Sequence, residues 1–265
     1  MPRVHSDVTH GVAVLTLDEP PANTYSYELM QELDTAVLAA RMDSSVHVIV
    51  LIGAGDKFFC AGATIGMLKD ADPDFKYYFC LHANETLNRL EQTPKLVIAA
   101  LNGHTVGGGL EVALAADLRI ARAGKARIGL PEVTLGVLPG TGGTQRLARL
   151  LGKARALELL VSGRLMSTSE ALDAGLVTEV WDEDRLDGRS FLEAVVDYAR
   201  TYTPPHKASR AVGRIKRAVQ SGAEAAFGEG LALERELQQL LFESRDAAEG
   251  IAASLEKRPP KFEGK

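Results

Sequence analysis

The chain is poor in cysteine and has no cluster of metal-ligating residues. Its 265 residues include only two cysteines, Cys60 and Cys80, which are too few for a disulfide framework. Cys60 lies in the apolar stretch 58–62. Because a reactive thiol needs exposure and a lowered pKa, a buried thiol is favoured over a nucleophile there. The six histidines are scattered along the chain, so the sequence predicts no metal site.

The chain also lacks an apolar run long enough to span a membrane. Its most apolar region, residues 96–116, is interrupted by Asn102, His104 and Glu111, whereas a spanning helix needs about 20 consecutive apolar residues. Residues 1–7 lack the apolar core of a signal peptide. We therefore expect no membrane association and a cytoplasmic location, with an organelle matrix as the alternative.

A surplus of basic residues is absent as well. The net charge is −5 and the calculated isoelectric point is about 5.7. This balance argues against nucleic-acid binding, because phosphate contacts require a basic face. A content of 46% hydrophobic and 25% charged residues is typical of a globular protein with a sizeable core. The length corresponds to one large domain or to a domain with an appendage.

The alternation of apolar strands with amphipathic helices predicts an α/β fold. Apolar runs predict strands at 12–17, 46–52, 95–101 and 118–121, and helical periodicity predicts helices at about 26–41 and 74–91. The near-continuous apolar run 46–52 is typical of a strand that is buried on both faces of its sheet. Such strands are joined by right-handed crossovers, and ligands bind at the loops that follow the strand ends.

The composition changes near Thr201, which divides the chain into a core, residues 1–200, and a helical region, residues 201–265. Helices are expected at 208–220, 223–244 and 246–257. Their apolar stripe contains Leu231, Leu233, Leu237, Leu240 and Leu241. Because so broad a stripe must be buried against the core or against another subunit, we expect this region to form an oligomer.

Three consecutive glycines, Gly107 to Gly109, lead into an apolar helix and precede Glu111. Glycine lets the backbone turn sharply and approach a ligand, and the first turn of a helix presents free N–H groups. Gly108 and Glu111 would share one face of the helix. A carbonyl oxygen bound by the Gly108 N–H would then place its neighbouring carbons near Glu111. The alternative is a tight turn followed by a glutamate that only interacts with the helix dipole.

A second carboxylate, Glu132, follows the constrained step Leu130-Pro131. Two carboxylates in one site can act as acid and base when their surroundings separate their pKa values. The small-residue stretch 59–63 follows a buried strand and could bring a second N–H donor toward the oxygen bound by Gly108. Taken alone, that stretch is only a turn.

Three further features have competing interpretations. The loop 140–146 is similar to a phosphate-binding loop but lacks its spacing, and a helix cap by Thr144 is favoured. His104 is interpreted as structural or pocket-lining rather than catalytic. A basic helical face, for which a solvated surface is favoured over contact with an anionic cofactor, comprises Arg210, Arg214, Lys216 and Arg217.

In their order along the chain, four motifs resemble the crotonase (enoyl-CoA hydratase/isomerase) family, and the similarity is closest to enoyl-CoA hydratases. The motifs are Phe59-Cys60-Ala61-Gly62-Ala63, Asn102 to Glu111, Leu130-Pro131-Glu132 and Gly136 to Leu147. The resemblance extends over essentially the whole chain. It implies a spiral of ββα repeats with a C-terminal α-helical trimerisation region, assembled into homotrimers or homohexamers.

The resemblance also implies a substrate and a role for each site residue. An acyl-CoA thioester would be bound with its carbonyl oxygen between the backbone N–H groups of Ala63 and Gly108, and Glu111 and Glu132 match the two glutamates of hydratases. Further substrate contacts are implied for Ala61, Thr64, Ile65 and Gly66. Coenzyme A is part of the substrate, so no separate cofactor is implied. Thr64 and Gly66 depart from the family pattern, in which an aspartate and a larger polar residue are common.

The implied reaction adds water across the 2,3 double bond of a 2-enoyl-CoA, with Glu111 accepting a proton from water and Glu132 delivering a proton to the α-carbon. Related isomerases commonly keep only one of these glutamates. One alternative is another reaction of the family, namely isomerisation, hydrolysis or decarboxylation of a specialised acyl group, which the departure at Thr64 motivates. Another is a non-catalytic or RNA-binding role, which the acidic composition opposes. Whether the acyl group is carried on CoA or on a carrier protein stays open.

Overall fold

Two β-sheets form the body of the chain. The computed structural model describes residues 2–265, except for the side chain of Leu68. Met1, which belongs to the segment 1–7 that lacks the apolar core of a signal peptide, lies outside the described residues. The large sheet consists, in spatial order, of β1 (Val4–Thr9), β2 (Val12–Leu17), β3 (Val48–Gly53), β5 (Leu96–Leu101), β7 (Leu118–Arg122) and β9 (Glu179–Trp181). The small sheet consists of β4 (Phe58–Cys60), β6 (His104–Val106) and β8 (Ile128–Gly129). Apart from the antiparallel pair β1–β2, the strand pairs in both sheets are parallel.

Successive strands alternate between the two sheets, and this alternation produces the spiral. The chain passes from β3 to β4, from β5 to β6 and from β7 to β8, and after each such pair it enters a helical segment. Each turn of the spiral thus adds one strand to each sheet. The ββα spiral that the resemblance implied is confirmed.

Helices surround these sheets and continue into the C-terminal region. The helices of the body are α1 (Tyr27–Met42), α2 (Ile65–Asp70), α3 (Pro73–Glu91), α4 (Gly108–Leu114), the 3-10 helix η1 (Glu132–Leu135), α5 (Gly143–Leu151), α6 (Lys153–Ser162), α7 (Thr168–Asp173), α8 (Glu183–Leu186) and α9 (Phe191–Arg200). The C-terminal helices are α10 (Ser209–Glu224), α11 (Phe227–Phe242) and α12 (Arg245–Glu256). None of the helices among the described residues has the length and apolar composition needed to cross a membrane.

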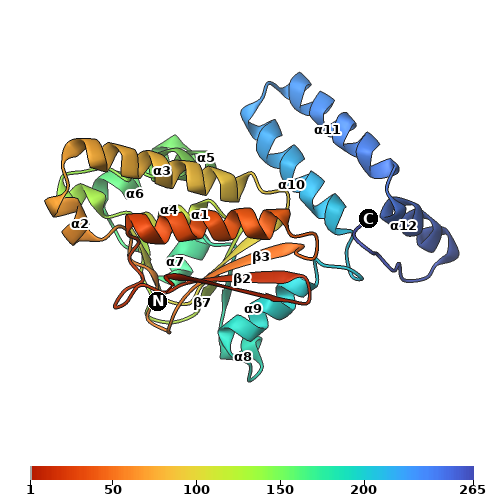
Figure 1. The fold of residues 1–265 in the computed structure, drawn as a ribbon, viewed down its shortest axis with the longest axis horizontal. Helices are drawn as coiled ribbons and strands as arrows, with labels where there is room; N and C mark the ends of the chain where they lie inside the picture. Colours follow the sequence, from red (N-terminus) through yellow and green to blue (C-terminus); the bar gives the residue numbers. More distant parts are fainter. Residues whose placement is uncertain (1) are drawn as a thin grey trace.

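The large sheet is buried on both faces, which explains the continuous apolar sequence of its central strands. In β3, Ile49 and Leu51 pack into the core under α1 and α3, whereas Val48 and Val50 pack into the second core beside α9. Figure 1 shows α1 and α3 on one face of the sheet and α9 on the other. Side chains of a strand alternate between the faces, so a strand that is covered twice needs apolar residues at every position.

The C-terminal helices α10, α11 and α12 extend away from the body at one end of the molecule (Figure 1). The apolar stripe predicted on this region is only partly covered within the chain: Leu237 is buried, Leu233 and Leu241 are half-buried, and Leu231 and Leu240 are exposed. The end of the chain returns to α12, where the Asp246 carboxylate accepts the backbone N–H groups of Glu263 and Gly264 at 2.7 and 2.8 Å. These contacts fix the tail against the arm.

Candidate active site

The three-glycine motif forms the turn between β6 and α4. Gly107 caps the helix with φ of +59°, a left-handed conformation that glycine adopts at low cost. Its N–H donates to the carbonyl of Gly129 at 2.9 Å, which joins the turn to β8. Every residue of α4 is buried. The first turn of a short buried helix therefore faces the interior of the spiral.

The loop after β4 lies directly against this helix start. A Cβ atom built on Gly62 would stand 2.8 Å from the Gly108 nitrogen, so this close approach requires glycine at position 62. Tyr25 donates its N–H to the Gly62 carbonyl at 2.9 Å and accepts the Thr64 N–H at 3.2 Å. Because backbone groups alternate along an extended segment, the Ala63 N–H points to the opposite edge. Within residues 2–265, neither Ala63 nor Gly108 donates its N–H to a protein acceptor.

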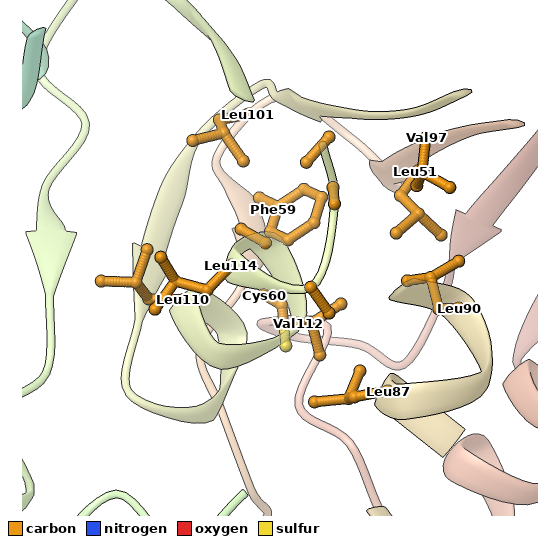
Figure 2. Close-up of a cluster of buried hydrophobic side chains, with 14 of the residues drawn as sticks. Leu51, Phe59, Cys60, Leu87, Leu90, Val97, Leu101, Leu110, Val112 and Leu114 are labelled. Carbon is orange, nitrogen blue, oxygen red and sulfur yellow. The ribbon is translucent and has the colours of Figure 1, made fainter. Parts of the chain in front are cut away.

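A packed core supports this backbone from behind. Figure 2 shows the Phe59 ring and the Cys60 sulfur among Leu110, Val112 and Leu114 of the α4 segment. Cys60 is fully buried, and burial raises the pKa of its thiol to about 12. The expectation of a buried thiol is confirmed, and the thiol is part of the scaffold under the site.

Glu111, at the first turn of α4, is a buried carboxylate with several hydrogen bonds. Its exposure is 2%. Oε1 accepts the N–H groups of Thr141 and Gly143 at 2.8 and 2.7 Å, and Oε2 accepts the Thr141 hydroxyl. Burial raises the pKa of Glu111, while these hydrogen bonds and Arg146 act in the opposite direction. Hydrogen bonds to the charged form favour the carboxylate, so the loop partly offsets the effect of burial on the pKa of Glu111.

The loop that holds Glu111 is residues 140–146, and its role differs from both interpretations of the sequence. Helix α5 is capped by Gly142 with no side-chain capping bond, so the helix cap predicted for Thr144 is wrong. Two neighbours anchor the loop: Asn84 donates to the Gly140 carbonyl at 3.1 Å, and Arg146 pairs with Glu91 at 2.8 Å. The N-terminal N–H groups of this segment bind the Glu111 side chain instead of a phosphate.

Glu132 begins the 3-10 helix η1 immediately after Pro131. Its Oε2 is buried and has no hydrogen-bond partner among the described residues. Burial, with a smaller contribution from the charge of Glu111, raises the pKa of Glu132 to about 7. An unpaired buried carboxyl group favours its neutral form, so Glu132 is suited to deliver a proton near neutral pH.

Both glutamates lie against Gly107, Glu132 with its carboxyl group and Glu111 with its backbone N–H. A Cβ atom on Gly107 would stand 3.2 Å from Oε1 of Glu132, and the same residue accepts the backbone N–H of Glu111 at 3.3 Å. Hydrogen bonds thus partly offset the effect of burial on the pKa of Glu111, whereas the buried oxygen of Glu132 has no such donor among the described residues. This difference in surroundings is what acid–base chemistry by two carboxyl groups requires.

The remaining residues with predicted substrate contacts lie in the loop that leads from β4 into α2. Ala61 and Ala63 are half-buried, whereas Ile65 is 65% exposed at the start of α2. The Thr64 hydroxyl donates to the hydroxyl of Thr24 at 3.2 Å, and Gly66 has open space around its Cα. The loop 61–66 thus borders the site with small or exposed residues.

Two other predictions concerned residues that lie outside the site. His104 accepts the Arg127 N–H at 3.1 Å and packs on Phe58, which agrees with a structural role. The solvated basic face predicted on α10 is wrong for Lys216, which is 8% exposed and pairs with Asp117 at 2.8 Å. A Lys side chain is rarely buried without such a partner.

Tyr25 and Thr141 contact the site but were not singled out from the sequence. Both are 3% exposed, and their hydroxyl oxygens lie 3.3 Å apart. Thr141 lies in the glycine-rich loop 140–146, whereas Tyr25 only precedes Ser26, the N-cap of α1. Their proximity depends on tertiary structure, since 116 positions separate them, and no local pattern could have indicated it.

Comparisons with known proteins show what the whole chain is similar to. The sequence model of the enoyl-CoA hydratase/isomerase family matches residues 7–265. A probable enoyl-CoA hydratase of Bacillus subtilis is 38% identical over 97% of this chain and 97% of its own length. A 2,3-dehydroadipyl-CoA hydratase of Escherichia coli is also 38% identical, over 96% of each chain. The crystal structure of an enoyl-CoA hydratase from Geobacillus kaustophilus superimposes with a TM-score of 0.95 at 43% identity, covering 100% of this chain and 98% of that one.

Proposed function

Since the chain belongs to the enoyl-CoA hydratase/isomerase family, we propose that it is an enoyl-CoA hydratase that adds water across the 2,3 double bond of a 2-enoyl-CoA thioester. Two backbone N–H groups, of Ala63 and Gly108, bind the thioester oxygen. Glu111 is the general base and Glu132 the general acid. Coenzyme A enters as part of the substrate.

The reaction begins with polarisation of the thioester. Hydrogen bonds from Ala63 and Gly108 draw electron density toward the carbonyl oxygen, which makes the β-carbon electrophilic and stabilises the enolate that forms after attack. A water molecule attacks the β-carbon while Glu111 takes its proton, and Glu132 gives its proton to the α-carbon. Removing one such N–H donor typically raises the barrier by about 3–4 kcal/mol.

The observation that supports this proposal most strongly is the contrast between the two glutamates. Glu111 has three hydrogen-bond donors on its oxygens, whereas Oε2 of Glu132 is buried without a partner in the described part of the chain. A site in which one carboxyl group is hydrogen-bonded by three donors and the other favours its neutral form can both take a proton from water and give one to carbon. Isomerisation requires only a proton shuttle, and a second, separately tuned carboxyl group favours hydration.

The test is turnover of a panel of 2-enoyl-CoA thioesters by the purified enzyme and by Glu111→Gln and Glu132→Gln. We expect hydration, seen as loss of the enone absorbance and a product heavier by one water, and a roughly 10²- to 10⁴-fold lower kcat in each variant. Glu158→Gln, at an exposed glutamate on α6, is the matched control and should retain activity.

Near wild-type turnover in either active-site variant would remove that glutamate from the mechanism. A product of unchanged mass with a moved double bond would instead identify an isomerase, and loss of CoA or of carbon dioxide would identify a hydrolase or a decarboxylase.

A further inference from the structure

The Tyr25 hydroxyl lies at the centre of the candidate site. The residue is 3% exposed, and its ring packs on Phe79 with the ring centroids 5.8 Å apart. A Cβ atom on Gly108 would stand 2.0 Å from the hydroxyl oxygen, so the phenol is in contact with the helix start that carries the proposed N–H donor. A phenylalanine would fill the same space without the oxygen.

From Tyr25 a chain of hydroxyl groups leads to the proposed base. The Tyr25 oxygen is 3.3 Å from the Thr141 oxygen, and the Thr141 hydroxyl hydrogen-bonds to Oε2 of Glu111. A hydroxyl has a single hydrogen. When Glu111 is ionised it can only accept, so Thr141 donates to Glu111 and Tyr25 donates to Thr141. The direction of the chain is therefore fixed by the charge on the carboxylate.

The two oxygens of Glu111 are held differently. Oε1 accepts two backbone N–H groups, from Thr141 and Gly143, and a backbone amide can only donate. A proton taken from water therefore has to arrive on Oε2, the oxygen that faces Thr141. A hydroxyl group can turn its hydrogen when Oε2 becomes protonated, whereas the donors on Oε1 cannot adapt.

We propose that the hydroxyls of Tyr25 and Thr141 form a positioning pair that orients Oε2 of Glu111 and favours its ionised form before catalysis. The inference rests on the proposed function for the role of Glu111. Tyr25 acts through Thr141, and neither hydroxyl is proposed to bond to substrate. Because adjacent hydrogen bonds polarise one another in a buried site, the outer hydroxyl strengthens the bond that the inner one makes.

The surroundings of Tyr25 suit it as a permanent donor. Burial, and to a smaller extent the negative charge of Glu111, raise the pKa of the phenol well above its ordinary value. The phenol therefore keeps its hydrogen near neutral pH. Arg146 adds rigidity, since its side chain also donates to the Thr141 carbonyl at 3.3 Å.

The first experiment compares Tyr25→Phe, Thr141→Val and Thr141→Ser with the wild type over a range of pH. We expect Tyr25→Phe to lower kcat roughly 3- to 10-fold with little change in KM, the effect of one net hydrogen bond. Removing donors from a charged group raises its pKa, so the acidic limb of the kcat profile should move to higher pH. Thr141→Val should shift it further, and Thr141→Ser, which retains the hydroxyl, should resemble the wild type.

A double variant and a matched control separate positioning from structural damage. Tyr25→Phe combined with Thr141→Val should be no slower than Thr141→Val alone, because Tyr25 has no effect without its acceptor. Tyr198→Phe removes a tyrosine hydroxyl that lies 2.7 Å from that of Tyr202, beside the second core, and should leave the pH profile unchanged. Thermal melting of each variant checks folding.

The inference is overturned if the Tyr25→Phe profile superimposes on that of the wild type, or if the two single losses multiply in the double variant. Carbon-13 NMR titration of the Glu111 carboxyl in wild type and Tyr25→Phe gives a readout that needs no turnover. If the wild type hydrates no enoyl-CoA, the proposed function fails, yet an upward shift of the Glu111 pKa in Tyr25→Phe would still support the pair, and an unchanged pKa would refute it.

Discussion

At the scale of single residues, the site is defined by how each carboxyl group is solvated. The pairing of Glu111 with Gly108 could be predicted from the sequence, because a helix places residues three positions apart on one face. The proximity of Glu132 to Glu111 and Gly108 could be expected only from the family resemblance. The hydrogen bonds that Thr141 and Gly143 donate to Glu111 could not be predicted from the sequence. Those contacts join a helix to a distant loop, and their existence depends on the path of the whole spiral.

The raised pKa of Glu132 has a consequence for stability. Its folded pKa is about 7, above the ordinary value of 4.5, so its contribution to stability is fully present below about pH 4.5 and is lost as pH rises through 7. At about pH 8, Glu132→Gln should therefore be more stable than the wild type by roughly 1–3 kcal/mol, the full linkage value being reduced for partial solvent access.

Urea denaturation of wild type and Glu132→Gln at about pH 5 and about pH 8 measures this difference. Glu236→Gln, at an exposed glutamate on α11, is the control and should show no pH-dependent gain. An equal difference in free energy at both pH values would mean that Glu132 is not desolvated in the folded protein. The same substitution is expected to stabilise the fold and to slow hydration, because an active-site group can lower stability and still be required for activity.

At the scale of elements, long and short segments differ in how far the sequence predicts them. Helix α1 and the strands β2, β3 and β5 were predicted within a few residues, because burial imposes a period on their sequences. The strands β4, β6 and β8, of two or three residues each, were not identified. β4 and β6 overlap the glycine-containing motifs, and all three strands are held by pairing with one another, so such short sequences carry no period of their own.

The start of α5 gives a test at this scale. A Cβ atom on Gly143 would stand 2.9 Å from Oε1 of Glu111 and 2.8 Å from Cβ of Pro139. Gly143→Ala should therefore displace the Glu111 carboxylate while the helix persists, and lower kcat roughly 10- to 100-fold, as small misplacements of catalytic groups do.

Gly228→Ala is the matched control, since position 228 also lies at the start of a helix and has open space around it. It should leave turnover unchanged. Steady-state kinetics and circular dichroism measure both effects. Unchanged kcat in Gly143→Ala would show that the position of Oε1 does not limit the reaction.

At the scale of the whole molecule, the C-terminal arm is the feature that the single chain leaves incomplete. The spiral buries its own core, yet α11 and α12 present Phe227, Phe242 and Leu255 at exposures of 81%, 61% and 81%. Large apolar side chains gathered on one arm mark an interaction surface. The sequence predicted an apolar stripe that must be buried against the core or another subunit, and within the chain Leu237 is buried whereas Leu231 and Leu240 are exposed.

We expect the 28.4 kDa chain to assemble in solution through this arm, as a homotrimer or a homohexamer, and light scattering coupled to size exclusion measures the mass. Phe242→Glu should shift the protein toward smaller species, because a charge cannot be buried in an apolar contact without a partner. Gln238→Glu adds the same charge at an exposed polar position of the same helix and should leave the assembly intact. A wild-type protein that elutes as a monomer at micromolar concentration would contradict the assignment, and the arm would then have to be stable with its apolar residues in water.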